Sequence, residues 1–100
     1  MSIRALYAEE FAEVEKVFGT GLDVTLVRVN ENNSLPDWIG RIGASLRGTP
    51  PPEHNAITLG NTCYFPVTLM THDPNHELWL RDICWLMHEL THAWEYQHDG

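Results

Sequence analysis

Three side chains near the carboxyl end of the sequence have the types and spacing of a zinc-dependent hydrolytic centre. His88, Glu89 and His92 form the pattern HExxH. Residues four apart in a helix lie one turn apart on the same face, so two imidazoles can bind one tetrahedral zinc ion. The glutamate beside the first histidine can then accept a proton from the water that zinc activates. The spacing therefore predicts one zinc per chain, bound by His88 and His92, with Glu89 as the general base.

The motif has a less specific alternative. Roughly one shuffled chain in thirty of this composition would contain HExxH, and two surface histidines beside a solvated Glu89 would explain it without metal. The context favours zinc: the apolar residues 85–87 precede the motif, and no glycine or proline interrupts residues 75–97. An uninterrupted helix is what this arrangement of ligands needs.

The N-terminal half of the chain must supply elements that pack against this helix. Apolar residues at helical spacing predict an amphipathic helix over residues 7–18, with Gly19 ending it. Residues 22–29 alternate like a strand. A short helical turn is expected within residues 35–46, followed by a stiff, proline-rich connector at 48–53.

The C-terminal half contains the rest of the sheet and the motif helix. Residues 55–66 read as two short strands joined by a tight turn at Gly60-Asn61. Asp73, as N-cap before a proline, predicts a long helix over residues 73–97. The expected fold is therefore α+β: an N-terminal helix, a small sheet of about three strands and a long C-terminal helix.

The composition limits the partners. The chain has 100 residues, enough for one domain over residues 1–100, with 6 Lys and Arg against 14 Asp and Glu. The net charge of −8 argues against nucleic acid and against an anionic membrane surface. No apolar run is long enough to span a membrane, and the first residues do not form a signal peptide, so a cytoplasmic location is expected. Cys63 and Cys84 lack CxxC spacing and lie in apolar stretches, which predicts two buried free thiols.

The run from Leu86 to Gln97 resembles the active-site helix of the zincin metallopeptidases. More narrowly, it resembles the small metallopeptidase domain of bacterial Vgr-related proteins and contractile injection systems, whose helix typically reads HELTHV-W-Q-Y-Q. Residues 17–19, 24–29 and 58–66 are also similar to that domain. The resemblance implies a minimal zincin that hydrolyses peptide bonds. By analogy with the zincin edge strand that pairs with extended substrate, it assigns substrate binding to Thr62, Cys63, Tyr64 and Phe65.

The resemblance also implies partners and a location. It predicts a peptide or protein substrate, a place in a secretion apparatus, and export through an injection system as the alternative to the cytoplasm. A non-catalytic metal-binding or structural module of that apparatus is a second candidate function, and a docking domain without metal is a third. Glu89 argues against a structural zinc site, because such a site has no use for a base.

The third zinc ligand that zincins require stays open. His98 lies six residues after His92, the offset of the ligand in HExxHxxGxxH zincins, but Glu95 stands where their glycine turns the chain back. Without that turn, His98 lies about 120° around the helix axis from the face that carries His88 and His92. The zincins of the other branch use a glutamate on a later helix, and this chain ends at Gly100, which suggests a truncated or naturally reduced form. Water, a partner subunit or a later segment are the alternatives to His98, as are the in-chain residues Glu95, Asp99, His72 and His76.

Aromatic residues complete the set of candidates. Trp79, Trp85 and Trp94 are expected in the core rather than as a platform for substrate. Apolar surface at Trp94 and Tyr96, or an unpaired strand edge, predicts self-association.

Overall fold

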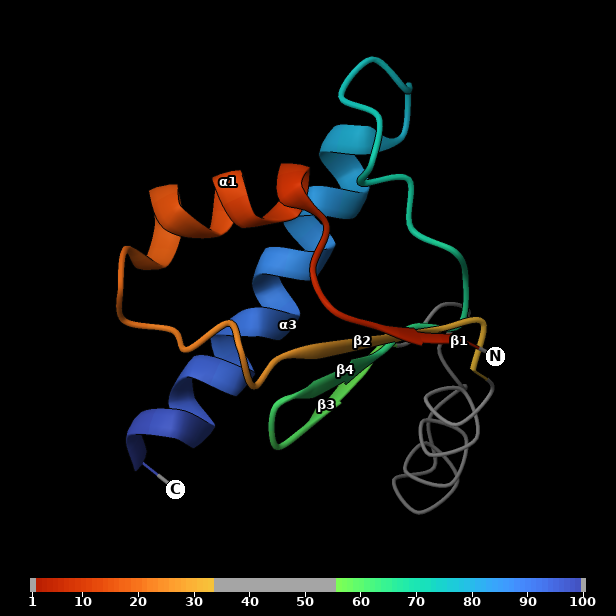
Figure 1. The fold of residues 1–100 in the computed structure, drawn as a ribbon. Coiled ribbons are helices and arrows are strands. Elements are labelled where there is room, and N and C mark those ends of the chain that lie inside the picture. Colours follow the sequence, from red (N-terminus) through yellow and green to blue (C-terminus); the bar gives the residue numbers. More distant parts are fainter. Residues whose placement is uncertain (1, 34–55, 100) are drawn as a thin grey trace, which may run out of the picture.

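Two helices and a four-stranded sheet make up the part of the chain that the computed structural model describes, residues 2–33 and 56–99 (Figure 1). The α+β class expected from the sequence is confirmed. The helical turn expected within 35–46 and the connector at 48–53 lie outside the described residues. In chain order the elements are β1 (Ser2–Arg4), α1 (Ala8–Phe18), β2 (Arg28–Glu31), β3 (Ile57–Leu59), β4 (Thr62–Tyr64) and α3 (Trp79–Asp99).

The sheet has the order β1-β2-β4-β3, one strand more than expected. β2 pairs antiparallel with β1 and parallel with β4, and β3 pairs antiparallel with β4. The additional strand, β1, is held by charge as well as by the backbone ladder. Arg4 Nε donates to Glu31 Oε1 at 2.8 Å, and its Nη1 donates to Glu10 Oε1 at 2.7 Å. These pairs tie β1 to β2 and to α1.

The strand expected over residues 22–29 is wrong in its extent, because β2 begins only at Arg28. Asp23 closes a local turn instead. Its carboxylate accepts the backbone N–H of Thr25 at 3.1 Å, and its carbonyl oxygen accepts that of Leu26 at 3.3 Å. Aspartate side chains commonly compete with a strand ladder in this way.

Two turns lie where glycine predicted them. Gly19 ends α1 with φ 58° and donates its N–H to Glu15 O at 3.0 Å. Gly60, with φ 62°, begins the two-residue turn between the paired residues Leu59 and Thr62. Both positions have the positive φ that glycine adopts at little cost.

The helix α3 begins at Trp79, later than the expected start at residue 73. The Asp73 carboxylate accepts the N–H of Asn75 at 3.0 Å, and His76 Nδ1 accepts the N–H of Leu78 at 3.1 Å. These bonds close two successive turns ahead of the helix. Asp73 therefore acts as a turn residue and not as the N-cap of α3.

The core lies where α3 packs against the hairpin β3–β4 and against α1 (Figure 1). Its fully buried side chains from α3 are Leu86, Leu90 and Ala93, which meet Val29 of β2 and Cys63 of β4. All three tryptophans expected in the core are partly buried and pack against it. No helix within residues 2–33 and 56–99 is both long and apolar enough to cross a bilayer.

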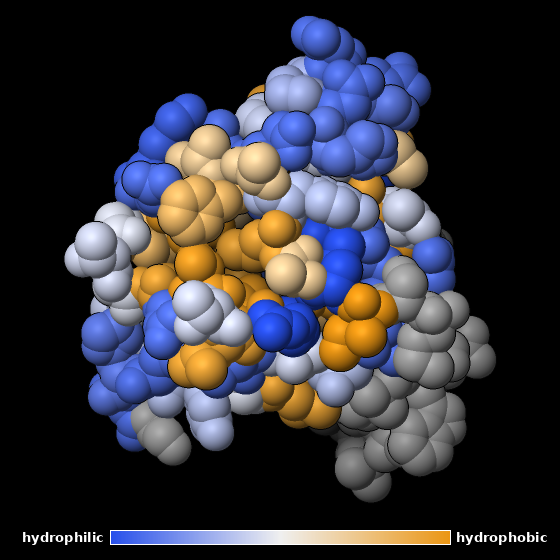
Figure 2. Space-filling model, in the orientation of Figure 1, coloured by the Kyte–Doolittle hydropathy of each residue, from blue (hydrophilic) through white to orange (hydrophobic). Residues whose placement is uncertain are grey.

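Apolar side chains also gather on the surface beside α1 (Figure 2). They line a hollow of about 580 Å³ between α1 and the segment that follows it. Phe11 at its edge is 40% exposed. Tyr96, on α3, is 50% exposed and lies near Gly60, whereas Trp94 is half-buried. Self-association through Trp94 and Tyr96 stays a prediction.

Candidate active site

The HExxH residues lie near the middle of α3, in the part of the helix that packs against the sheet. Leu86, Leu90 and Ala93 are fully buried and recur at helical spacing. This stripe sets the rotation of α3 about its axis, because burying apolar surface is the main contribution that packing makes to stability. The same rotation leaves His88 and His92 accessible and places Glu89 at the boundary between the core and the surface.

The two histidines lie close enough to share one ion. Their ring centroids are 5.4 Å apart and the rings are nearly perpendicular, at 87°. Two imidazoles on one tetrahedral zinc, with Zn–N distances of about 2.0–2.1 Å, have ring centroids roughly 5 Å apart. The observed separation of His88 and His92 therefore fits a shared zinc ion.

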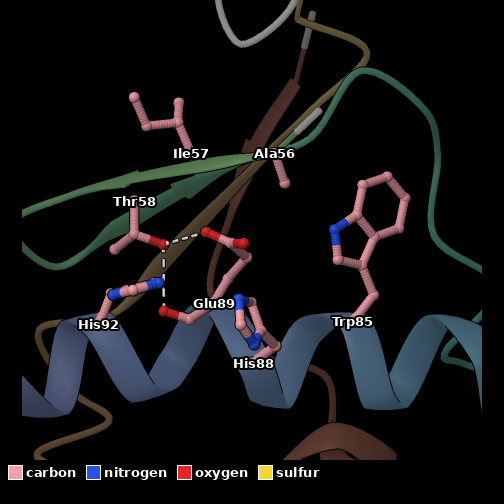
Figure 3. Close-up of a pocket in the computed structure, with 7 residues that line it drawn as sticks. All are labelled: Ala56, Ile57, Thr58, Trp85, His88, Glu89 and His92. Carbon is pink, nitrogen blue, oxygen red and sulfur yellow. Dashed lines mark hydrogen bonds between the residues drawn. The ribbon is translucent and has the colours of Figure 1, made fainter. Parts of the chain in front are cut away.

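An open pocket of about 460 Å³ lies between β3 and α3 and contains this pair. Figure 3 shows Glu89 reaching from α3 toward Thr58 on β3, with Trp85 at one end of the pocket. The Trp85 ring is fixed edge-on to Phe65, with their centroids 5.1 Å apart. The pocket is lined by Ala56, Ile57, Thr58, Trp85, His88, Glu89 and His92.

Glu89 is a buried carboxylate with only one of its oxygens hydrogen-bonded. The residue is 6% exposed, and its Oε1 accepts the Thr58 hydroxyl at 2.9 Å. Across residues 2–33 and 56–99, no donor lies within hydrogen-bonding distance of Oε2. A buried carboxylate oxygen without a partner is costly unless a proton, a water molecule or a cation satisfies it. This oxygen belongs to a residue that lines the same pocket as His88 and His92.

Glu95 contacts the second histidine. Its Oε1 lies 3.4 Å from His92 Nδ1, and both side chains are about half exposed. A carboxylate near Nδ1 favours the tautomer that leaves Nε2 free to bind metal. The contact places Glu95 beside His92, one of the two predicted ligands.

His98, the predicted third ligand, makes its contacts with Gly21 and Trp94 outside the pocket, and its role as a ligand stays a prediction. Its Nε2 lies 2.7 Å from the carbonyl oxygen of Gly21, and its ring packs against Trp94 at a centroid distance of 4.6 Å. Helical geometry carries it off the face of His88 and His92, since Glu95 continues the helix. His72 and His76 precede α3, where His72 contacts Tyr7 and His76 accepts from Leu78. Within the described ranges, no group of three His, Cys, Asp or Glu side chains is placed to hold a metal ion.

Replacing His98 with alanine is therefore expected to leave zinc affinity unchanged. The variant should lose about 0.5–1.5 kcal/mol of unfolding free energy, because the contact with Gly21 is lost. Zinc titration by isothermal calorimetry and urea unfolding measure the two effects. A large loss of zinc affinity with an intact fold would return His98 to the ligand set.

The substrate strand assigned by resemblance is corrected by the sheet order. β4 lies between β2 and β3, so both of its edges are already paired. Cys63 and Phe65 are fully buried, which removes their side chains from contact with a substrate. Among the described strands, the edge beside the pocket is β3, which lies against α3. Thr62, Cys63, Tyr64 and Phe65 support β3 from the inner side of the sheet.

The two cysteines are both free, but only Cys63 is buried. Cys84 is exposed, contrary to the expectation, although it follows the buried Ile83 on α3. Burial raises the pKa of the Cys63 thiol from 9.0 to about 11. Its Sγ lies 3.5 Å from Thr58 Oγ1, directly beneath the pocket wall.

The native protein is expected to react with a thiol reagent at Cys84 only. At pH 8 the raised pKa of Cys63 lowers its thiolate fraction about 100-fold, and burial blocks access as well. A disulfide-exchange reagent should therefore modify one thiol rapidly and the other only after unfolding. The Cys84→Ser variant serves as the control, since it should show no rapid phase. A rapid phase in that variant would contradict the burial of Cys63.

Comparisons with known proteins yield no relative: no family model, no curated protein and no solved structure matches this chain. The resemblance to the zincins therefore rests on the residues of the sequence. Function has to be inferred from the chemistry of the pocket itself.

Proposed function

We propose that the pocket between β3 and α3 is the active site of a zinc-dependent peptidase. The observation that carries the proposal is Glu89: a buried carboxylate with one oxygen held by Thr58 and no partner for the other among residues 2–33 and 56–99, in the same pocket as His88 and His92. A structural ion pair would satisfy both oxygens, whereas a general base must keep one available. His88 and His92 would hold the zinc ion.

Zinc, when bound, supplies Lewis-acid catalysis, which polarises a carbonyl and makes water easier to deprotonate. Glu89 Oε2 accepts the proton of the attacking water as the new carbon–oxygen bond forms. It then passes that proton to the departing amine nitrogen as the peptide carbon–nitrogen bond breaks. The products are a carboxylic acid and an amine, so the base is returned to its starting state.

The free edge of β3 would bind the substrate backbone. An extended peptide can add to such an edge by main-chain hydrogen bonds. Ile57, Ala56 and Trp85 add apolar surface to the pocket walls, where a substrate side chain can lie. A peptide bound along β3 would pass directly above His88 and His92.

The experiment is hydrolysis of a mixed peptide library by the zinc-loaded protein, by the protein treated with a chelator, and after zinc is added back. We expect cleavage in the first and third samples and none in the second. Cleavage that survives complete removal of metal would contradict the proposal.

A second candidate is a metal-binding module without catalysis. It is favoured by the absence of a third ligand near His88 and His92 in the described part of the chain. Two protein ligands leave two positions of a tetrahedral ion to water or to a partner. This candidate predicts stoichiometric zinc and no cleavage of any peptide in the library.

A further inference from the structure

The Thr58 hydroxyl lies at the contact between β3 and the HExxH helix. Its oxygen is 2.9 Å from Glu89 Oε1, 3.1 Å from the main-chain oxygen of Glu89 and 3.5 Å from Cys63 Sγ. A hydroxyl has a single proton to donate. The carboxylate is both the nearest and the strongest of the three acceptors, since hydrogen bonds to ionised groups are the shorter and stronger ones.

We propose that Thr58 is a positioning residue for Glu89: its hydroxyl holds Oε1, so that Oε2 stays directed into the space beside His88 and His92. The proposal rests on the proposed function, in which Glu89 is the base. A glutamate side chain has three rotatable bonds and loses considerable freedom when it is fixed. A donor from a separate element restricts that freedom before substrate arrives, which is how catalytic groups are preorganised.

Thr58 lies on β3, the strand at the edge of the sheet that residues 2–33 and 56–99 form. Asn61 O accepts from Arg28 N at 3.1 Å, and Phe65 N donates to Asn30 O at 2.8 Å, so alternate residues of β4 face β2. The residues between them face β3, and they pair there with Ile57 and Leu59. Because hydrogen-bonding direction alternates along a strand, the N–H and C=O of Thr58 point outward. The residue that holds the base is therefore also one whose backbone has no strand partner on its outer side within the described residues, where an incoming peptide can pair.

Cys63 supports Thr58 from within the core. The two residues are paired across β3 and β4, and Cys63 is fully buried. Its thiol stays protonated at neutral pH, because burial raises its pKa to about 11. A neutral thiol is a weak acceptor, so it leaves the Thr58 proton to Glu89.

The test compares two substitutions of the same side chain in the zinc-loaded protein. Thr58→Val keeps the shape and the strand preference but removes the hydroxyl, whereas Thr58→Ser keeps the hydroxyl. We expect Thr58→Val to lower kcat about tenfold or more with KM within about twofold, and Thr58→Ser to restore most of kcat. Thr68→Val is the matched control, because it also removes a hydroxyl that has a side-chain partner, Asn32, outside the pocket. Unchanged kcat in Thr58→Val would overturn the proposal.

A double-mutant cycle gives a measurement that does not depend on activity. In the metal-free protein, Thr58→Val should raise the unfolding equilibrium constant about tenfold. The increase should be clearly smaller in a Glu89→Ala background, where the carboxylate is already gone. Equal increases in both backgrounds would show that Thr58 does not act on Glu89. The cycle can also show that Thr58 and Glu89 stabilise the fold together while the wild-type protein cleaves no peptide. That outcome would refute the proposed peptidase function but leave the Thr58–Glu89 contact standing.

Discussion

Replacing Glu89 with glutamine is expected to reduce peptide hydrolysis by about 10²-fold or more. Glutamine has the same size and keeps an oxygen that can accept the Thr58 hydroxyl, but its amide cannot take a proton from water. Zinc content and the fold should therefore be retained. Initial rates on a cleaved peptide, measured with the zinc-loaded variant, give the size of the effect.

Glu77→Gln is the matched control for this prediction. It removes one negative charge at an exposed position ahead of α3 that is not part of the pocket lining. Its rate should equal that of the wild type. If Glu89→Gln also keeps the wild-type rate, Glu89 has no part in the reaction.

Replacing His88 or His92 with alanine is expected to abolish stoichiometric zinc binding. The two imidazoles are the only pair in the described part of the chain that lines the pocket, and losing one leaves a single protein ligand. We expect the affinity to fall roughly 10²-fold or more for each single variant. Metal analysis after dialysis against a series of fixed free zinc concentrations measures the zinc affinity of each variant.

His72→Ala is the control for the histidine variants, because His72 is exposed and contacts Tyr7 rather than the pocket. It should bind zinc as the wild type does. Both histidines of the motif are accessible, so their removal should leave the fold intact, and circular dichroism can verify this. Full zinc binding by the double variant His88→Ala/His92→Ala would place the metal elsewhere.

The parts of the fold that sequence could predict are those encoded over a few residues. HExxH predicts a shared face of one helix, because helical spacing alone brings His88 and His92 together. Gly60 predicts the hairpin turn, because its positive φ is costly for other residues. α1 was predictable for the same reason, from apolar spacing and the glycine that follows it.

The parts that could not be predicted depend on partners far along the chain. β1 is three residues long and shows no alternation of its own, and the Arg4–Glu31 pair that helps to hold it joins residues 27 apart. The order of β3 and β4 in the sheet decides which edge is free, and no local pattern encodes that order. The substrate strand was misplaced for this reason.

Thr58 is the clearest functional residue that sequence reasoning missed. Its contact with Glu89 spans 31 residues and exists only because β3 packs against α3. A polar residue within an apolar strand, Ile57-Thr58-Leu59, was the available signal. Such a residue needs a partner when the strand is packed against a helix, but its identity requires the fold.

The most direct test of the zinc peptidase is a titration of metal-free protein with zinc, in which bound metal and peptide cleavage are measured in the same samples. Both should rise together and saturate at one zinc per chain. In Glu89→Gln the bound metal should follow the same curve, whereas the rate of cleavage should fall about 10²-fold or more. Cleavage that does not depend on added zinc, or zinc that binds fully without any cleavage, would contradict the proposed function.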